Sequence, residues 1–410
     1  MKHFNFFAPI VFLGFIMICS CDSEPMSLED QKQKNQEIIL SKGKPSKLST
    51  QTYTITNGMT FSDINAVLDQ TVSGDTVVVE TGTYIISGQL HLKDGIFIRK
   101  QSSTTPIFDA QATSSSQMLQ QYYTSNTSDI DIFGIQFRNI RFNIQNASNT
   151  KFRYCIFDYG VRKSGTDKGY TADAYLQLNN CSNMQVRGCV FKRRNGNSGR
   201  GIYSVGNTGT DISNNTFGNG GDTGYFVTAI NDNSDGTTIS GNTIIRNVAW
   251  VNTSETDHGI YAHSFDGLSI VGNTISGWPA NSSGGAIKAR NGQNLTITGN
   301  TMNTSGVLLY VYSNNAANPF LKHVVVENNT INVASADNDI YHGIGYWRNT
   351  NDPTFYEYSI KINNNDLPNG RIKIGTPVDA SNFNANGGGV FNNDVGAITL
   401  PAGIANSGNY

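Results

Sequence analysis

The stretch LSIVGNTI at residues 268–275 decides the fold, because a short alternating strand followed by Asn-Thr-hydrophobic recurs along the chain. The clear copies of this triplet begin 27 to 31 residues apart, at Asn215, Asn242, Asn273, Asn300 and Asn329. A self-similar period in this range indicates a repeat fold, and β-branched strands without helical periodicity favour a β-solenoid over a helical one. We therefore predict an all-β, single-stranded right-handed parallel β-helix in which each copy marks one turn.

The asparagines have a physical role at the bend between two strands. Their side-chain amides can bond to the backbone and to the Asn of the next turn, so we expect them to stack in one column. Cys155 and Cys189 stand at the same place in earlier turns and are expected to fill that column as small inward residues. Asn365 and Asn393 extend the register toward the C-terminus.

The segment before the repeats has the features of a solenoid entrance. Residues 61–68, FSDINAVL, have helical spacing with Ser62 or Asp63 as the expected N-cap, and this short helix is predicted to cover the first open turn. Residues 74–84, GDTVVVETGTY, indicate a strand, a turn and a strand. This pattern resembles the opening of pectin-lyase-like β-helix proteins, and with the repeat the resemblance extends over roughly residues 52 to 400. It implies a superfamily but no particular reaction.

The N-terminus has the pattern of a bacterial lipoprotein. A basic start precedes an apolar run, and ICSC at residues 18–21 resembles a lipoprotein box with Cys21 as the lipidated residue. The run is shorter than the roughly 20 residues that a transmembrane helix needs. We predict a lipoprotein signal peptide over residues 1–21, a disordered tether over 22–50 and the β-helix domain over 51–410. The expected location is the outer membrane, facing the periplasm or the cell surface.

Composition limits the partners. The formal net charge is −2 and only 15% of residues are charged, which argues against a nucleic-acid-binding surface. No Pro- or Ser-rich linker interrupts the repeats, so we expect a single monomeric domain that touches the membrane only through its lipid. The spacing of Cys155, Cys181 and Cys189 is unlike that of a zinc site.

Four predicted strands carry a patch of basic and aromatic side chains. Aligning the turns brings residues 260–263, 287–290, 309–312 and 345–348 into register, and alternation sends every second side chain outward. One outward column is predicted to contain Tyr261, Lys288, Tyr310 and Tyr346, and the column beside it His263, Arg290, Tyr312 and Arg348. Earlier turns add only Gln177, Asn179 and Tyr203 to this face, and His258 borders it. Aromatic rings that pack on sugars, with cations that bind carboxylate or sulfate, are typical of a groove for an acidic polysaccharide.

β-Elimination of a uronic-acid polymer needs the residue types of this patch. A cation neutralises the carboxylate, a base removes the C5 proton and an acid protonates the leaving O4. We predict that Arg290 binds the carboxylate, that Lys288 or a neighbouring Tyr or His is the base, and that a Tyr is the acid. Arg290 is expected to lower the pKa of Lys288, and a Tyr beside either cation is expected to ionise more readily. The predicted catalytic residues are Lys288, Arg290, Tyr261, His263 and Tyr310, and the predicted substrate-binding residues are Tyr312, Tyr346, Arg348, Tyr203, Gln177 and His258.

The segment IKARNG at residues 287–292, followed by GVLLY at 306–310, resembles the alginate lyase and chondroitinase B family of β-helix polysaccharide lyases. The resemblance implies an alginate-like substrate, Lys288 as base and an Arg at the stacked position of the next turn, where our alignment places Tyr310. It also implies acidic residues that hold Ca²⁺ near the substrate carboxylate. The candidate ligands for Ca²⁺ are Glu255, Asp257, Asp232 and Asp235.

Three other functions are compatible with the predicted fold. A glycoside hydrolase needs two carboxylates facing one groove, whereas the outward columns contain Lys, Arg, His and Tyr. A C5-epimerase shares the first half of the lyase chemistry and then returns a proton to C5. A non-catalytic surface glycan-binding solenoid would spread aromatics over many turns, whereas this patch concentrates basic and phenolic groups on a few.

Overall fold

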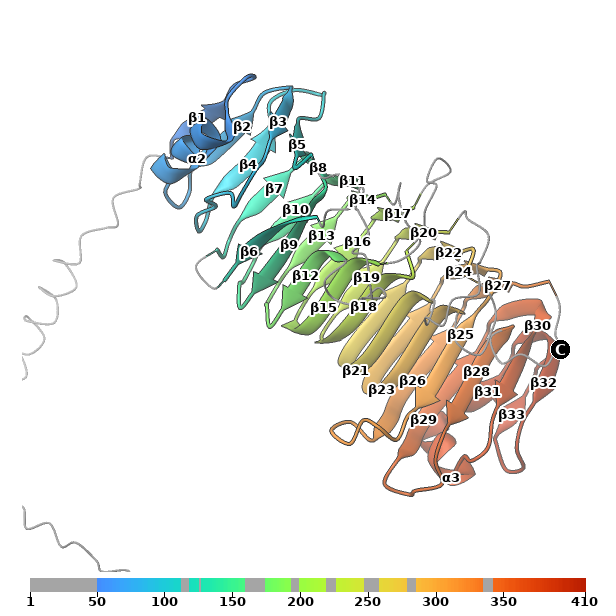
Figure 1. The fold of residues 1–410 in the computed structure, drawn as a ribbon. Helices are drawn as coiled ribbons and strands as arrows, with labels where there is room; N and C mark the ends of the chain where they lie inside the picture. Colours follow the sequence, from blue (N-terminus) through green and yellow to red (C-terminus); the bar gives the residue numbers. More distant parts are fainter. Residues whose placement is uncertain are drawn as a thin grey trace, which may run out of the picture. The chain divides into compact units, whose positions relative to one another are not determined.

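The computed structural model describes residues 50–410 apart from 112–117, 125–126, 159–173, 193–198, 219–225, 247–257, 279–284 and 335–341. The described residues confirm the predicted fold, a right-handed parallel β-helix whose strands stack turn upon turn (Figure 1). The signal peptide, the lipidation site Cys21 and the tether fall on residues 1–50, of which only Thr50 is described, and they stay predictions.

Three stacks of strands form the walls of the coil, and the pairings between successive turns are parallel. Stack 1 contains β1 (Thr52–Ile55), β2 (Thr76–Val79), β4 (Phe97–Lys100), β7 (Asp131–Phe133), β10 (Lys151–Arg153), β13 (Gln185–Arg187), β16 (Asp211–Ser213), β19 (Thr238–Ser240), β26 (Phe320–Glu327), β29 (Tyr356–Asn363), β31 (Gly389–Phe391) and β33 (Asn406–Ser407). Stack 2 contains β3 (Thr83–Ile85), β5 (Ile107–Asp109), β8 (Gln136–Arg138), β11 (Ile156–Asp158), β14 (Val190–Phe191), β17 (Thr216–Phe217), β20 (Thr243–Ile245), β22 (Thr274–Ser276), β24 (Thr301–Asn303) and β27 (Thr330–Asn332). Stack 3 contains β6 (Leu119–Tyr123), β9 (Ile140–Gln145), β12 (Ala174–Asn179), β15 (Arg200–Thr208), β18 (Thr228–Asp235), β25 (Val307–Val311) and β28 (Gly343–Arg348).

Four longer strands each contribute to two stacks. β21 (His258–Val271) and β23 (Gly285–Thr298) begin in stack 3 and continue into stack 1. β30 (Asp366–Ile374) and β32 (Asp394–Thr399) begin in stack 2 and continue into stack 3. Because a single strand spans the bend, the outer faces of the two stacks are held in a fixed relation on these turns.

The predicted asparagine column is confirmed. From Asn215 to Asn365, each asparagine of the column donates its backbone N–H and its Nδ2 to Oδ1 of the asparagine on the next turn, over 2.9 to 3.1 Å. Cys189 stands at the head of this asparagine ladder and donates its backbone N–H to Asn215, as its place in the repeat predicted. Asn393 and Asn409 form the last pair of the ladder. The ladder therefore fixes the register of successive turns, and none of its buried amides is left without a hydrogen-bond partner.

The interior beside the ladder is packed with aromatic and aliphatic side chains. The rings of Phe157, Phe191 and Phe217 are stacked, with centroids 4.8 and 4.6 Å apart and planes within 7° of parallel. Cys155 is fully buried in the same core, as predicted for a small inward residue. The core therefore gives each turn a rigid wall on which outward side chains are displayed.

The N-terminal cap is the predicted helix, although its first boundary differs. α2 (Phe61–Gln70) follows Thr60, whose hydroxyl accepts a hydrogen bond from the Asp63 N–H while the Asp63 carboxylate accepts one from the Thr60 N–H. This capping box makes Thr60 the N-cap, so the predicted caps Ser62 and Asp63 are wrong. A capping box needs a hydrogen-bond acceptor side chain at the third helical position, which is where Asp63 stands.

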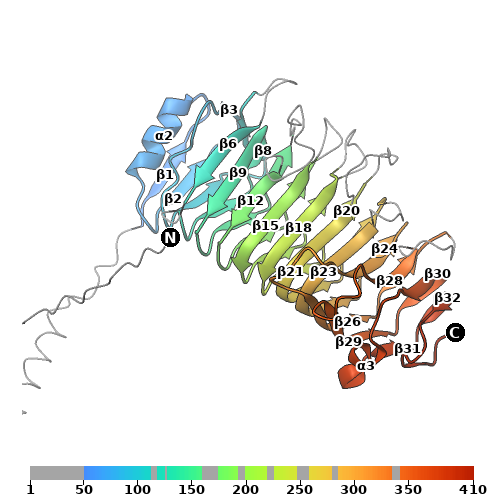
Figure 2. The ribbon, with the colours of Figure 1, turned by 60° about the horizontal axis from the view of Figure 1, so that its bottom comes forward.

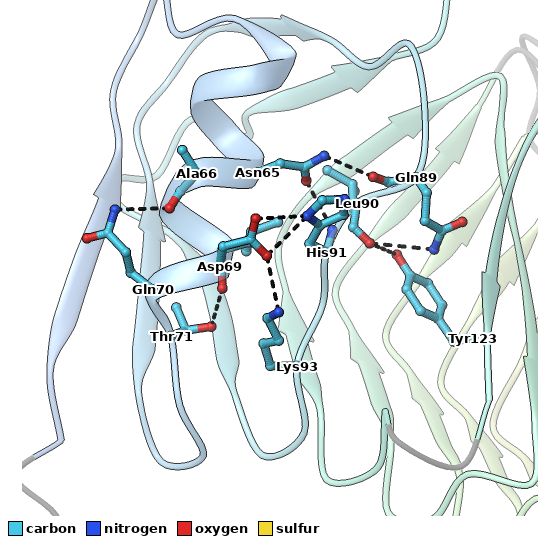
Figure 3. Close-up of polar contacts among 11 residues, drawn as sticks. Asn65, Ala66, Asp69, Gln70, Thr71, Gln89, Leu90, His91, Lys93 and Tyr123 are labelled. Atoms are coloured by element: carbon cyan, nitrogen blue, oxygen red, sulfur yellow. Dashed lines mark hydrogen bonds and ion pairs between the residues drawn. The ribbon is translucent and has the colours of Figure 1, made fainter.

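Polar contacts tie α2 to the following turns (Figure 3). Asp69 contacts the ring of His91 at 3.0 Å and the amine of Lys93 at 3.1 Å, and Asn65 donates to the carbonyl of Gln89. The apolar face of the helix joins the hydrophobic core through residues that include Leu68. The helix therefore covers the first turn, as expected for a solenoid cap.

The C-terminal turns are covered by α3 (Ala380–Phe383) and the 3-10 turn η2 (Ala385–Gly387). Phe383 is buried and meets the ring of Tyr346 edge to face, with centroids 5.7 Å apart. Across the described ranges, neither helix combines the length and the hydropathy needed to cross a membrane.

Candidate functional site

The outer face of stack 3 brings most of the predicted site residues together, many of them on β21 and β23, which lie side by side in Figure 2. Tyr261 of β21 pairs with Lys288 of β23, and His263 pairs with Arg290, as the alignment predicted. Paired residues on neighbouring parallel strands lie side by side on one face, so these four side chains are adjacent. We call the group on this face the Lys288 cluster, which contains His258, Tyr261, His263, Lys288, Arg290, Tyr310, Tyr312 and Trp347.

The next turn joins the cluster in a different register from the predicted one. Lys288 pairs with Leu308, and Tyr310 pairs with Arg290 instead of Lys288. The predicted alignment is thus displaced by two residues, because the connection before β25 is short. A two-residue displacement keeps a side chain on its face of the sheet, so Tyr310 remains outward but lies in the column of Arg290.

The predicted outward orientation of Tyr346 and Arg348 is wrong, because both side chains are buried. Tyr346 pairs with Leu309, is fully buried and donates from its hydroxyl to the carboxylate of Glu357. Arg348 forms an ion pair of 3.4 Å with the same carboxylate and donates to the carbonyl of Phe355. The alignment is displaced by one residue here, and a one-residue displacement moves every side chain to the opposite face.

Trp347 takes the outward position that the sequence assigned to its neighbours. Its ring lies 5.1 Å from that of Tyr310, with which it pairs, and 42% of the side chain is exposed. Tyr312 continues the aromatic surface, with its ring 5.5 Å from Tyr310. Strand alternation in the sequence could have placed Trp347 outward. The length of the connection before β28 prevented us from counting the correct pairing of this strand with β25.

Cations and rings alternate across the cluster. The amine of Lys288 lies 5.2 Å from the ring of Tyr310 and 5.9 Å from that of Tyr261. The Arg290 guanidinium lies 5.5 Å from Tyr261 and 5.3 Å from Tyr312. In the described part of the chain no carboxylate forms an ion pair with either cation, so both charges are available to an anionic ligand.

Burial and mutual repulsion change the protonation of the basic groups. Burial, followed by the charge of Arg290, lowers the pKa of Lys288 to about 8, in the predicted direction. Burial, followed by Arg290 and Arg200, lowers the pKa of His263 to about 4. Burial also lowers the pKa of His258, whose two ring nitrogens have no hydrogen-bond partner among the described residues and whose ring lies 5.1 Å from Tyr261. Both histidines are therefore neutral near pH 7.

The tyrosines behave opposite to the prediction. Burial raises the pKa of Tyr261, and it raises the pKa of Tyr310 to about 12, although Arg290 opposes the change at both residues. The loss of hydration of the phenolate outweighs the attraction of the guanidinium. These phenols stay protonated and can donate a proton but not accept one.

The earlier turns continue the same face without the cationic pair. Gln177 pairs with Tyr203, and both residues lie in the predicted column. The column continues through Asn231 to Tyr261. Arg200, which the sequence analysis missed, lies 5.3 Å from the ring of Tyr203. Gln177 and Asn231 are 6% and 2% exposed, so among the column residues of these earlier turns only Tyr203 is partly accessible to a ligand.

Of the four predicted Ca²⁺ ligands, the structure describes Asp232 and Asp235, which differ in exposure. Asp232 is buried in the solenoid interior, where it accepts a hydrogen bond from Thr237, whereas Asp235 is exposed. Glu255 and Asp257 lie outside the described residues. Within the described ranges no group of three His, Cys, Asp or Glu side chains could hold a metal ion.

The sequence matches no protein-family model and no curated protein sequence. Its structure is similar to the surface adhesin PfbA of Streptococcus pneumoniae, with 12% identity and a TM-score of 0.48 over 83% of this chain and 87% of that chain. It is also similar to the A-module of the Azotobacter vinelandii mannuronan C-5 epimerase AlgE4, with 14% identity and a TM-score of 0.44 over 86% and 99% of the two chains. It is similar as well to an alginate lyase from Paenibacillus sp. str. FPU-7, with 15% identity and a TM-score of 0.34 over 79% of this chain and 98% of that chain. At these identities the similarity concerns the β-helix fold alone.

Proposed function

We propose that the protein is a polysaccharide lyase that cleaves an acidic, uronic-acid-containing polysaccharide, such as alginate, by β-elimination. The state of Lys288 is the observation that carries this proposal. The residue is 9% exposed, and its amine, with a pKa of about 8, lies on an outward face beside Arg290 without a carboxylate partner among the described residues. An amine with these properties is suited to remove a proton slightly above neutral pH.

The reaction assigns one role to each of three side chains. Arg290 binds the substrate carboxylate and stabilises the negative charge that develops as the C5 proton leaves. Neutral Lys288 takes this proton on Nζ, the C–H electron pair forms the C4–C5 double bond, and the C4–O4 bond breaks. Tyr310, whose pKa of about 12 keeps it protonated, donates its proton to O4. Cleavage gives two fragments. One has an unsaturated uronate at its non-reducing end, and the other has a new reducing end.

The aromatic surface beside these groups supports binding of a sugar chain. Trp347 and Tyr312 flank Tyr310 and expose ring faces or edges on the same side of the sheet. Sugar rings pack on such surfaces through their C–H faces, which orients the chain across the cationic pair. His258, His263 and Tyr261 complete the wall on the other side of Lys288.

Two enzyme alternatives fit this geometry less well. The Lys288 cluster has no carboxylate among its residues, whereas a glycoside hydrolase needs a pair of them. An epimerase returns a proton to the opposite side of C5, whereas the groups of the cluster all project from one sheet. A syn elimination needs its base and acid on a single side of the sugar ring, so both can come from this sheet.

The test is turnover of polymannuronate, polyguluronate, polygalacturonate and chondroitin sulfate, followed by the ultraviolet absorbance of the unsaturated product. We expect absorbance to rise with at least one of them in parallel with chain shortening. New reducing ends without absorbance would indicate hydrolysis, and exchange of the C5 hydrogen without chain cleavage would indicate epimerisation. Binding without any of these changes would leave a glycan-binding solenoid.

A further inference from the structure

A polar hollow lies on a different wall of the solenoid from the Lys288 cluster. It has a volume of about 320 Å³ and opens on the outer face of stack 1, over β7, β10 and β13. Its lining is polar and comes from three successive turns, with the residues Asp131, Lys151, Arg153, Tyr154, Gln185 and Arg187. We call it the Tyr154 hollow. It shares no residue with the Lys288 cluster, which lies on stack 3.

The charge of the hollow is only partly neutralised. Arg153 donates from Nε and Nη2 to the two carboxylate oxygens of Asp131, at 2.9 and 2.6 Å. Lys151 and Arg187 have no carboxylate partner in the described part of the chain, and Arg187 is exposed. Asp131 thus holds one cation in place, and two others remain for a ligand with negative charge.

An exposed aromatic ring stands beside these cations. Tyr154 is 54% exposed and its backbone is in the left-handed region, with φ of 54°. The ring covers Gly188 of the next turn so closely that a Cβ there would lie 2.7 Å from it, and it packs 5.4 Å from Phe133. The left-handed backbone and the glycine together fix the ring at the rim of the hollow.

We propose that the Tyr154 hollow is a non-catalytic binding site for an acidic saccharide. Tyr154 packs against a sugar ring, and Lys151 and Arg187 bind its carboxylate or sulfate groups. The combination of an exposed ring with two unpaired cations over adjacent turns suits a charged sugar better than an anionic membrane, because a membrane surface would be met by a broader basic and apolar area. This proposal does not depend on the lyase reaction.

The test is retardation of the full-length protein in native gels that contain polymannuronate, heparin or, as the neutral control, dextran. Retardation is compared with and without Tyr154→Ala and the pair Lys151→Ala and Arg187→Ala, in the native protein and again in the Lys288→Ala background, so that the comparison holds whether or not the native protein cleaves the polymer. We expect each change to weaken binding of at least one acidic polymer about tenfold, equivalent to about 1.4 kcal/mol. Tyr154→Phe keeps the ring and should retain binding.

Matched controls separate a site from general charge. Lys322→Ala with Lys361→Ala removes two cations from β26 and β29, strands of the same wall. Equal loss of binding in this control, or unchanged retardation of the hollow variants, would overturn the proposal. So would binding of the protein to vesicles with anionic lipid that is lost in the hollow variants while binding to every acidic polymer is kept. Thermal melting of each variant checks that the fold is intact.

Discussion

The asparagine ladder and the Lys288 cluster are built on the same turns of one solenoid and obey opposite rules. The ladder repeats one residue on successive turns, and its asparagines from Asn215 to Asn393 are buried and each is hydrogen-bonded to the next. The cluster places a different side chain on every turn, and its two cations have no described carboxylate partner. Repetition stabilises the coil, and the departure from repetition forms the proposed site. Changes in the ladder should alter stability alone, and changes in the cluster should alter turnover or binding alone.

Replacement of Lys288 should have the largest effect. Lys288→Ala removes the proposed base, and loss of a general base lowers the rate by a factor of about 10² to 10⁴. The measurement is kcat on the polymer that the native protein cleaves, with melting temperature as the check on folding. Lys361→Ala, a partly exposed lysine of stack 1, should leave kcat unchanged. Near-normal turnover of the Lys288 variant would remove this residue from the reaction.

The interior carboxylate gives the protein a stability that depends on pH. Burial raises the pKa of Asp232 to about 6, from an unfolded value near 3.8. Its stabilising effect is fully present below about pH 4 and is lost as pH rises through about 6, a change of about 3 kcal/mol at most. Asp232→Asn should remove this part of the pH dependence, as measured by chemical denaturation at pH 4 and pH 7. Asp235→Asn, an exposed change on the same strand, should not.

A break in the ladder should cost stability without loss of chemistry. Asn300→Ala leaves the Asn273 backbone N–H and the carbonyl of Ile270 without these partners and removes one acceptor of the Asn273 Nδ2, which costs about 1 to 3 kcal/mol. Asn332→Ala removes an exposed asparagine that pairs with Asn303 on the surface, and should cost less than about 0.5 kcal/mol. Denaturant unfolding measures both. Equal losses in the free energy of unfolding would show that an asparagine of the buried column stabilises the protein no more than a surface asparagine does.

The aromatic surface should affect affinity more than rate. Trp347→Ala removes an exposed ring that packs on Tyr310, so we expect KM to rise about tenfold with kcat nearly unchanged, a binding loss of about 1.4 kcal/mol. Trp347→Phe should recover part of this loss. A lower kcat with an unchanged KM would place Trp347 in the chemical step instead.

The sequence predicted the inward features better than the outward ones, for a physical reason. The ladder asparagines follow each strand immediately, so their register can be counted directly. The outward register depends on the length of the connections between stacks, which set Tyr310 two residues away from its predicted partner and turned Tyr346 into the core. Trp347 was missed for the same reason. The pKa directions of the tyrosines depend on burial, which strand alternation alone does not measure.

The dependence of kcat/KM on pH tests the role of Lys288 most directly, because it reports the pKa of the essential base in the free enzyme. We predict that kcat/KM rises with pH through a pKa of about 8 and then levels, since the free amine is the active form. Arg290→Gln should move this rise to higher pH, because the neighbouring charge that favours the neutral amine is gone. A rise controlled by a group near pH 4, where His263 titrates, or a profile that is flat between pH 6 and 10, would contradict the account.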